Sequence, residues 1–199
     1  MSRRKYWGLG KRNFTTLVSA LLALALYFAQ QQGWLSSVFN AAEVNQPGTY
    51  KVARYVDGDT VAVDMDGKPE TVRFIGIDTP ETHKPNTPVQ CYGPAAAAHT
   101  KTVISQAGGR VRLVADPLGT NRDRYDRLLR YVYLPDGTLV NELNVREGYA
   151  FYYPYFPFAK KEQFAAAQTE AQAAHRGLWG NCTPTPTDGG GYKMEQSAN

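Results

Sequence analysis

The chain has 199 residues, enough for one domain of ordinary size with terminal extensions and too few for two such domains to fit comfortably. Its 22 Lys and Arg exceed its 18 Asp and Glu, but five of those cations lie within the first 12 residues, which leaves 17 basic against 18 acidic residues beyond them. The rest of the chain is therefore nearly neutral, which excludes nucleic-acid binding through overall charge and leaves only a local basic patch for that purpose.

The N-terminal region has the layout of a membrane-targeting segment. The basic residues 1–13 precede the apolar stretch 14–35, and no charged residue occurs from Asn13 to Ala42. Cations before an apolar run predict that residues 1–13 stay in the cytoplasm. Residues 14–35 then form either an uncleaved single-pass transmembrane anchor or a cleaved signal peptide. The first alternative places the rest of the chain outside the cytoplasm at the cell membrane, and the second makes it a secreted protein.

Turn-forming residues mark the limits of the folded part. The stretch "NQPGT" (45–49) ends a predicted linker, residues 36–49. The stretch "TPTPTDGGG" (183–191) opens what we expect to be a flexible C-terminal tail, residues 183–199. The folded domain is predicted to span residues 50–182.

Five stretches of that domain are rich in Val, Ile, Tyr and Thr and predict β-strands: "YKVARYV" (50–56), "TVAVDM" (60–65), "ETVRFIGI" (70–77), "RVRLVAD" (110–116) and "LLRYVYL" (128–134). Asp66-Gly67 is typical of the hairpin turn between the second and the third. Three stretches predict helices, each stopped by glycine: "PAAAAHTKTVISQA" (94–107), "NELNVRE" (141–147) and "AKKEQFAAAQTEAQAAHR" (159–176). The expected fold is α+β and mainly a β barrel, an OB-like five-stranded barrel with three packed helices.

Two acidic turns are candidates for a metal site. Each of "DGDT" (57–60) and "DTPE" (78–81) is ordinary turn chemistry when taken alone. If the first three strands form a meander, however, Asp59 and Asp78 come close together. Two carboxylates at short range need a compensating charge, and a hard divalent cation with oxygen ligands is the simplest one.

The basic counterpart is "NRDRYDRLLRYVY" (121–133), which carries four arginines interleaved with two aspartates. One interpretation is a solvated loop whose arginines pair with its own aspartates. The other is a phosphate site, because arginine binds phosphate with two parallel hydrogen bonds. Arg73, inside a predicted strand, also needs an anionic partner or ligand.

These parts predict a phosphodiesterase site. A cation at Asp59 and Asp78 would bind a phosphoryl oxygen, Arg73 and Arg127 would neutralise the charge that builds on the phosphate, and Glu81 would accept a proton from an attacking water. The aromatic-rich "YAFYYPYFPF" (149–158) would form either part of the core or a surface on which bases stack.

The chain has two cysteines, Cys91 and Cys182. In an oxidising compartment we expect them to form a disulfide, with two independent buried thiols as the alternative.

In order and with similar spacing, the chain resembles the staphylococcal nuclease (thermonuclease-like) family through "VDGDTV" (56–61), "VRFIGIDTPET" (72–82), "DRYDRLLRYVY" (123–133) and "AQAAHRGLW" (171–179). The resemblance implies an OB-fold barrel with three helices. It also implies a calcium-dependent endonuclease, expected to be a monomer, that cleaves DNA and RNA with little sequence preference and leaves 3'-phosphates.

The resemblance carries over to single residues. It implies that Ca²⁺ is held by Asp59, Asp78 and the Thr79 carbonyl, and that catalysis falls to Arg73, Glu81 and Arg127. It further implies that the substrate is contacted by Arg124, Tyr125, Tyr153 and Tyr155.

One departure and one alternative function follow from the same comparison of motifs. Asp126 stands where the family commonly has glycine, so its carboxylate could hold Arg127 in an ion pair. Barrels of this type also occur as non-catalytic modules that bind nucleic acid or protein. Modules that have lost catalysis lack the carboxylates or arginines of the site. This chain keeps all six of the metal-binding and catalytic residues named above, which favours the enzyme.

Overall fold

The computed structural model describes residues 18–24, 27, 48–82 and 88–194. The chain divides into two units, Met1–Val44 and Asn45–Asn199. In the first unit, residues 18–24 are helical and exposed. No helix among the described residues is long and apolar enough to cross a membrane. The predicted anchor or signal peptide, residues 14–35, lies mostly outside the described residues and stays a prediction.

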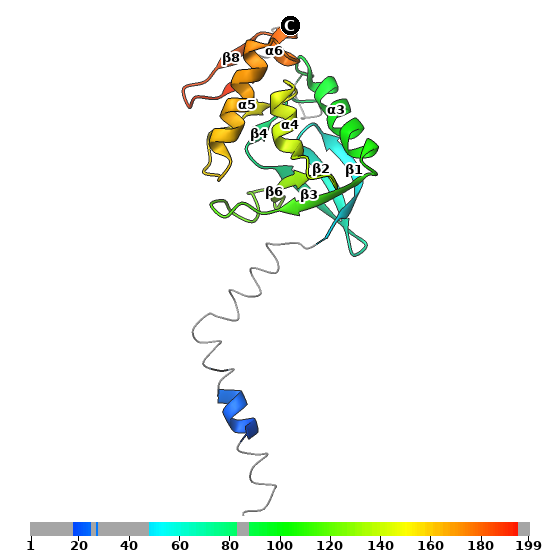
Figure 1. Ribbon diagram of the computed structural model, residues 1–199, viewed down its shortest axis with the longest axis vertical. Helices are drawn as coiled ribbons and strands as arrows, with labels where there is room; N and C mark the ends of the chain where they lie inside the picture. The colour runs from blue at the N-terminus through cyan, green and yellow to red at the C-terminus, as the bar shows by residue number, and fades with distance from the viewer. Residues whose placement is uncertain (1–17, 25–26, 28–47, 83–87, 195–199) are drawn as a thin grey trace, which may run out of the picture. The chain divides into compact units, whose positions relative to one another are not determined.

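The second unit is built on a closed barrel with strand order β1-β2-β3-β6-β5, as expected for an OB-like fold (Figure 1). Neighbouring strands are antiparallel except β3 and β6, which run parallel. The strands are β1 (Tyr50–Asp57), β2 (Thr60–Met65), β3 (Lys68–Phe74), β5 (Arg110–Val114) and β6 (Leu128–Tyr133). All five correspond to stretches that the β-branched and aromatic composition predicted.

The β2–β3 hairpin shows why these residues form strands. Asp66 and Gly67 have φ values of 54° and 80°, the positive values that a tight two-residue hairpin turn requires. Val61 pairs with Val72 across the hairpin, and both are fully buried, as is Val63. These valines fill the inside of the barrel, so the register of the hairpin is set by its apolar face.

The third predicted strand differs from the structure, because it is broken in two. After β3 the chain turns at Gly76 (φ +72°) and continues as β4 (Ile77–Asp78). A Cβ at Gly76 would lie 2.6 Å from the Phe158 ring, so only glycine fits there. β4 pairs with β7 (Phe151–Tyr152) rather than with a strand of the barrel.

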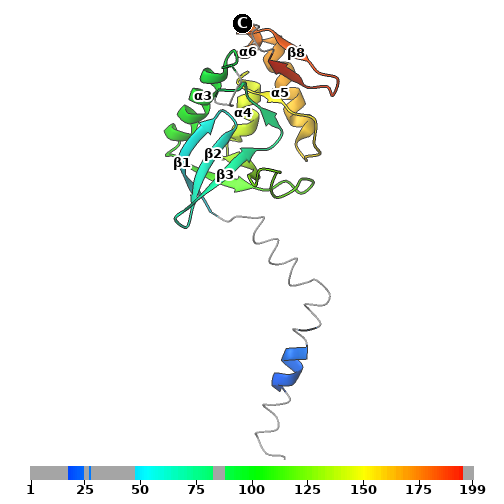
Figure 2. The same ribbon diagram turned by 180° about the vertical axis from the view of Figure 1, so that it is seen from behind.

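The three predicted helices are present as α3 (Gly93–Gln106), α4 (Val140–Arg146) and α5 (Lys161–Ala173), followed by a short α6 (Leu178–Asn181). Figures 1 and 2 both show α4 between α3 and α5. The fully buried Asn141 fastens α4 to the barrel: its Oδ1 accepts the Val132 N–H at 2.8 Å, and its Nδ2 donates to the Ile75 carbonyl at 2.9 Å.

The expectation of a flexible tail from residue 183 is wrong for the residues that the structure describes there. β8 (Pro184–Pro186) and β9 (Tyr192–Met194) form an antiparallel hairpin. Its Met194 packs in a small apolar cluster with Phe151 and Leu178, to which Tyr192 also contributes. The glycines and prolines of this stretch belong to a hairpin that is stabilised by distant apolar residues, a signal that local composition does not contain.

The predicted disulfide is confirmed, and the alternative of two independent thiols is excluded. Cys91 and Cys182 are bonded, with their Cα atoms 6.1 Å apart across a sequence separation of 91 residues. The bridge ties the residues just before α3 to the residue that follows α6.

Candidate active site

The Arg73 guanidinium joins two carboxylates from different parts of the chain. Arg73 lies near the end of β3, where it pairs in register with Thr60. Its Nη1 lies 2.7 Å from Asp59 Oδ2, and its Nη2 lies 2.7 Å from Asp78 Oδ1. Nη1 also donates to the Ile77 carbonyl at 2.9 Å. The structure thus brings together three of the predicted site residues, as the meander of strands required.

The second acidic turn, "DTPE", contacts the first one, "DGDT". Asp59 is only 4% exposed, and its two carboxylate oxygens accept the Thr60 hydroxyl at 2.8 Å and the Thr79 N–H at 2.9 Å. Gly58 permits this approach, because a Cβ at that position would lie 2.8 Å from Thr79 Cγ2. Thr79, the expected carbonyl ligand, therefore lies against the "DGDT" turn.

Side chains from two helices form hydrogen bonds with that turn. The Gly58 carbonyl accepts hydrogen bonds from Thr100 Oγ1 of α3 at 2.7 Å and from Asn144 Nδ2 of α4 at 3.1 Å. Asn144 Nδ2 also donates to Thr100 Oγ1 at 2.8 Å. Both side chains are fully buried. Sequence reasoning missed this support, because neither residue belongs to a motif that carries chemistry.

Burial, together with neighbouring carboxylates, raises two pKa values at the site. Burial, together with the charge of Asp59, raises the pKa of Asp57 to about 6. Burial and the charges of Asp59, Asp57 and Glu81 raise the pKa of Asp78 to about 7, although Arg73 acts in the opposite direction. Asp57 therefore belongs to the acidic cluster, a role that sequence reasoning missed although "DGDT" contains it.

The charge of Glu81 acts on the same two carboxylates, because it contributes to raising the pKa of both Asp57 and Asp78. Its backbone is fixed by Gln90. The Glu81 N–H donates to Gln90 Oε1 at 2.7 Å, and the Glu81 carbonyl accepts the Gln90 N–H at 2.9 Å. The acidic side chain thus extends from a backbone position that is held on both sides.

Arg127 is held by Asp123, which corrects the idea that Asp126 holds it. Asp123 Oδ2 lies 2.7 Å from both Nε and Nη2 of Arg127. Asp126 has a positive φ of 63°, and its Oδ1 lies instead 3.6 Å from Arg122 Nε. Burial would raise the pKa of Asp123, but hydrogen bonds from Arg127 and Tyr125 lower it below its usual range.

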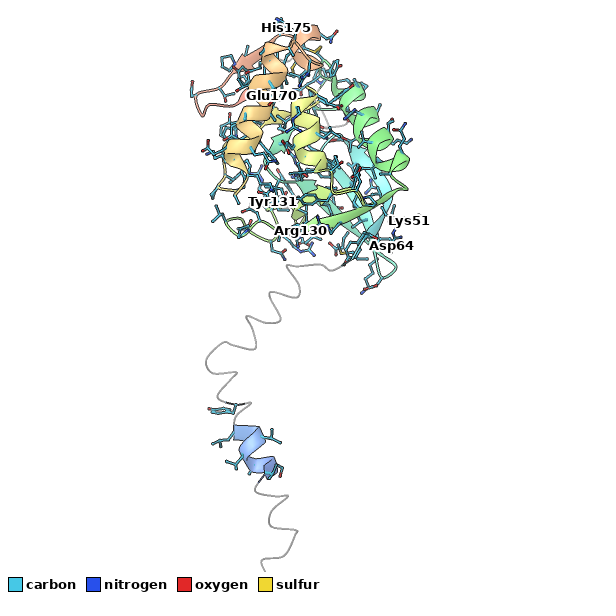
Figure 3. All side chains as sticks on the ribbon, in the orientation of Figure 1. Lys51, Asp64, Arg130, Tyr131, Glu170 and His175 are labelled. Atoms are coloured by element: carbon cyan, nitrogen blue, oxygen red, sulfur yellow. A yellow bond between two sulfur atoms is a disulfide. The ribbon has the colours of Figure 1, made fainter. Side chains whose placement is uncertain are left out.

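Two other arginines of the basic stretch, Arg122 and Arg130, make contacts within the protein. Arg130 is fully buried in β6, next to Tyr131 (Figure 3), and its Nη2 donates to Asn121 Oδ1 at 2.6 Å. Arg122 Nη1 lies 3.0 Å from Glu70 Oε2. The interpretation that arginines pair with aspartates of their own loop is confirmed for Arg127 with Asp123 and for Arg122 with Asp126. The phosphate site stays a prediction. Arg124 Nη2 donates to the Tyr125 hydroxyl at 2.7 Å.

Of the four predicted substrate contacts, Arg124, Tyr125 and Tyr155 are exposed and Tyr153 is half-buried. Tyr153 N–H donates to the Gly76 carbonyl at 2.9 Å, next to β4. Burial raises the pKa of Tyr153, Asp78 raises it further, and Arg73 and Arg124 lower it.

Tyr125 and Tyr155 each lie next to another of the predicted substrate contacts. The Tyr155 ring lies 4.7 Å from that of Tyr153, and the Tyr125 ring lies 4.7 Å from the Arg124 guanidinium carbon. Tyr125 is 64% exposed and Tyr155 42%, which leaves both accessible to a ligand.

The donor set suits a hard cation, although its present geometry is that of an ion-pair network. Among the described residues no group of three or more His, Cys, Asp or Glu is arranged to hold a metal ion. Arg73 lies between Asp59 and Asp78. Burial and the neighbouring carboxylates raise the pKa values of Asp57 and Asp78, and a bound cation would act to lower both. Carboxylate and carbonyl oxygens are the ligands that calcium prefers.

Comparison with known proteins gives a consistent result. The model of the family described as staphylococcal nuclease homologue matches residues 71–181. The chain is 40% identical over 168 residues to the thermonuclease of Staphylococcus hyicus, covering 83% of this chain and 94% of that protein. It is 38% identical over 167 residues to the thermonuclease of Staphylococcus intermedius, with 82% and 94% covered. It is also 42% identical over 128 residues to endonuclease YncB of Bacillus subtilis, with 63% and 59% covered.

Proposed function

The chain belongs to the staphylococcal nuclease family, and we propose that it is a calcium-dependent endonuclease that hydrolyses DNA and RNA with little sequence preference, leaving 3'-phosphates. The single observation that carries this proposal is the convergence of Arg73 with Asp59 and Asp78, at 2.7 Å each. A buried guanidinium between two carboxylates, with Glu81 in the same field, is suited to bind and polarise a phosphodiester.

In the proposed reaction, Arg73 and Arg127 donate hydrogen bonds to the non-bridging oxygens of the phosphate and stabilise the negative charge that builds there. Glu81 accepts a proton from the attacking water, whose oxygen forms a bond to phosphorus. The bond from phosphorus to the 5' oxygen breaks, and this oxygen takes a proton from water and leaves as a hydroxyl group, so the phosphate stays on the 3' side.

Asp59, Asp78 and the Thr79 carbonyl would hold Ca²⁺. When bound, the ion would supply Lewis-acid stabilisation of a phosphoryl oxygen. The proposal is supported by the oxygen ligands that the fold brings together, because Asp59 and Asp78 meet at Arg73 and Thr79 lies against Asp59.

The substrate strand is proposed to lie along Arg124, Tyr125, Tyr153 and Tyr155. Arg124 would pair with a phosphate, and the exposed tyrosine rings would stack on bases. Stacking on a ring face does not distinguish one base from another, which is consistent with cleavage at many sequences.

The protein is proposed to act outside the cytoplasm as a monomer. The support is the pattern of cations in residues 1–13 before the apolar stretch 14–35, together with the disulfide between Cys91 and Cys182. Immunoblotting of membrane and culture-medium fractions, with the mature size determined, separates a tethered protein from a secreted one.

The proposed activity is tested with the full chain and labelled single-stranded DNA and RNA. We expect cleavage with calcium, loss of cleavage on chelation, and 3'-phosphate ends in the products. Glu81→Gln should lower the rate by about a hundredfold or more. Binding without cleavage at any calcium concentration would contradict the proposal and favour a non-catalytic binding module.

A further inference from the structure

The backbone on both sides of Glu81 is held by a single residue, Gln90. The side chain of Gln90 accepts the Glu81 N–H at 2.7 Å, while its own N–H donates to the Glu81 carbonyl at 2.9 Å. Two hydrogen bonds of opposite direction between the same two residues restrict the backbone of Glu81 on either side of its Cα. The backbone that carries the Glu81 carboxylate is therefore held in place, although it belongs to a turn.

The start of α3 presses on the same backbone. A Cβ at Gly93 would lie 2.8 Å from the Glu81 carbonyl oxygen and 3.0 Å from that of Pro80. The Gly93 N–H donates to the Gln90 carbonyl at 3.0 Å. The segment from Gln90 to Gly93 is thus the support on which the Glu81 turn rests.

The disulfide fixes this support to the other side of the fold. Cys91, between Gln90 and the start of α3, is bonded to Cys182. The Cys182 N–H donates to the Leu178 carbonyl at 2.9 Å, and the Leu178 N–H donates to the Gly148 carbonyl at 2.8 Å. Leu178 is fully buried. Hydrogen bonds and the disulfide therefore connect Gly148, which follows α4, through α6 to the segment that contains Gln90.

We propose that Gln90 is a positioning residue for Glu81 and that the Cys91–Cys182 disulfide keeps Gln90 in place, so that the nuclease requires the oxidised bridge for full activity. This rests on the proposed role of Glu81 as proton acceptor. A dithiol reductant would convert the bridge to two thiols while being oxidised to its own disulfide. Release of Cys91 would then loosen Gln90 and leave the Glu81 carboxylate less well aimed at the water.

Gln90 is tested with the bridge intact. In Gln90→Ala we expect kcat to fall about tenfold or more with KM little changed, because the loss concerns the proton acceptor and not substrate binding. Gln90→Glu keeps an acceptor for the Glu81 N–H and should recover most of the rate. Val89→Ala is the matched control, because Val89 is the exposed neighbour of Gln90. A Gln90→Ala enzyme with the kcat of the wild type would overturn the proposal.

The disulfide is tested with dithiothreitol on the full chain, at a temperature where circular dichroism shows the reduced protein to be folded. We expect kcat to fall by a factor similar to that of Gln90→Ala. The double variant Cys91→Ser/Cys182→Ser should start at the low rate and show no response to the reductant. An unchanged kcat in reduced, folded wild type refutes the role of the bridge.

The two proposals fail in different ways. If the oxidised wild type cleaves no nucleic acid, the proposed function itself is wrong. If the wild type is active and the Gln90→Ala and reduced proteins match it, only the positioning role is wrong.

Discussion

The Asp123 carboxylate holds the Arg127 guanidinium, with Asp123 Oδ2 at 2.7 Å from both Nε and Nη2. Asp123 Oδ1 also accepts the Arg127 backbone N–H at 3.0 Å. The adjacent Asp126 cannot take this role, because its backbone turns into the left-handed region and its side chain is 87% exposed. The arginine is therefore oriented by the residue four positions before it.

This relationship predicts opposite outcomes at the two aspartates. Asp126→Gly should leave turnover within about twofold of the wild type, because surface ion pairs of this kind contribute little. Asp123→Asn should lower kcat by about tenfold, since Arg127 loses the anion that aims it. Steady-state kinetics on single-stranded DNA compare the two variants, and a larger loss for Asp126→Gly would show that the assignment is reversed.

Arg73→Lys should lower kcat/KM by about a hundredfold or more, because lysine cannot reach two carboxylates and a phosphate with a planar fork. Arg54→Lys is the matched control, since Arg54 is an exposed arginine on strand β1 of the same barrel. Its kcat/KM should stay within about twofold of the wild type. Equal rates for the two variants would remove Arg73 from the reaction.

Thr100→Val removes the hydroxyl that binds the Gly58 carbonyl and leaves Asn144 without that partner, both in the buried interior. We expect the free energy of unfolding to fall by about 1–3 kcal/mol and the rate to fall with it. Thr102→Val, an exposed position on the same helix, should change the free energy by less than about 0.5 kcal/mol. Urea denaturation measures both, and similar values would contradict the role of Thr100.

His99 makes stability depend on pH. Its ring stacks on Tyr149 at 3.8 Å, and burial lowers its pKa although Glu147 acts to raise it. The unfolded chain therefore binds the proton first, at about pH 6.5, and stability is lost as the pH falls from there toward the folded pKa.

His99→Phe keeps a ring that can stack on Tyr149 and removes the titration. The Tm of this variant should fall less between pH 7.5 and 5.5 than that of the wild type, as measured by calorimetry. Parallel pH dependences would show that His99 does not contribute.

The C-terminal hairpin is predicted to contribute to stability. Met194 is 7% exposed and packs with Phe151 and Leu178. Met194→Ala should lower the free energy of unfolding by about 2 kcal/mol or more. Lys193→Ala, at the exposed position beside it, should change that free energy by less than about 0.5 kcal/mol in the same denaturation experiment. If both variants unfold like the wild type, the hairpin is not part of the cooperative unit.

Local patterns in the sequence were sufficient for the barrel and its helices. Strands such as "TVAVDM" (60–65) are marked by their β-branched residues, and Asp66-Gly67 specifies the turn that pairs β2 with β3. The closeness of Asp59 and Asp78 also followed, because a meander returns the end of the third strand to the start of the second.

The sequence by itself thus determined the fold class, the presence of acidic residues close to Arg73, and the expectation that the two cysteines form a disulfide. The tertiary structure alone decided which aspartate holds Arg127, that Gln90 holds Glu81, and that residues 184–194 form a hairpin. The physical reason is range. Periodicity and turn chemistry act between neighbours in sequence, whereas these contacts depend on backbone dihedral angles and on apolar partners that only the folded chain brings together.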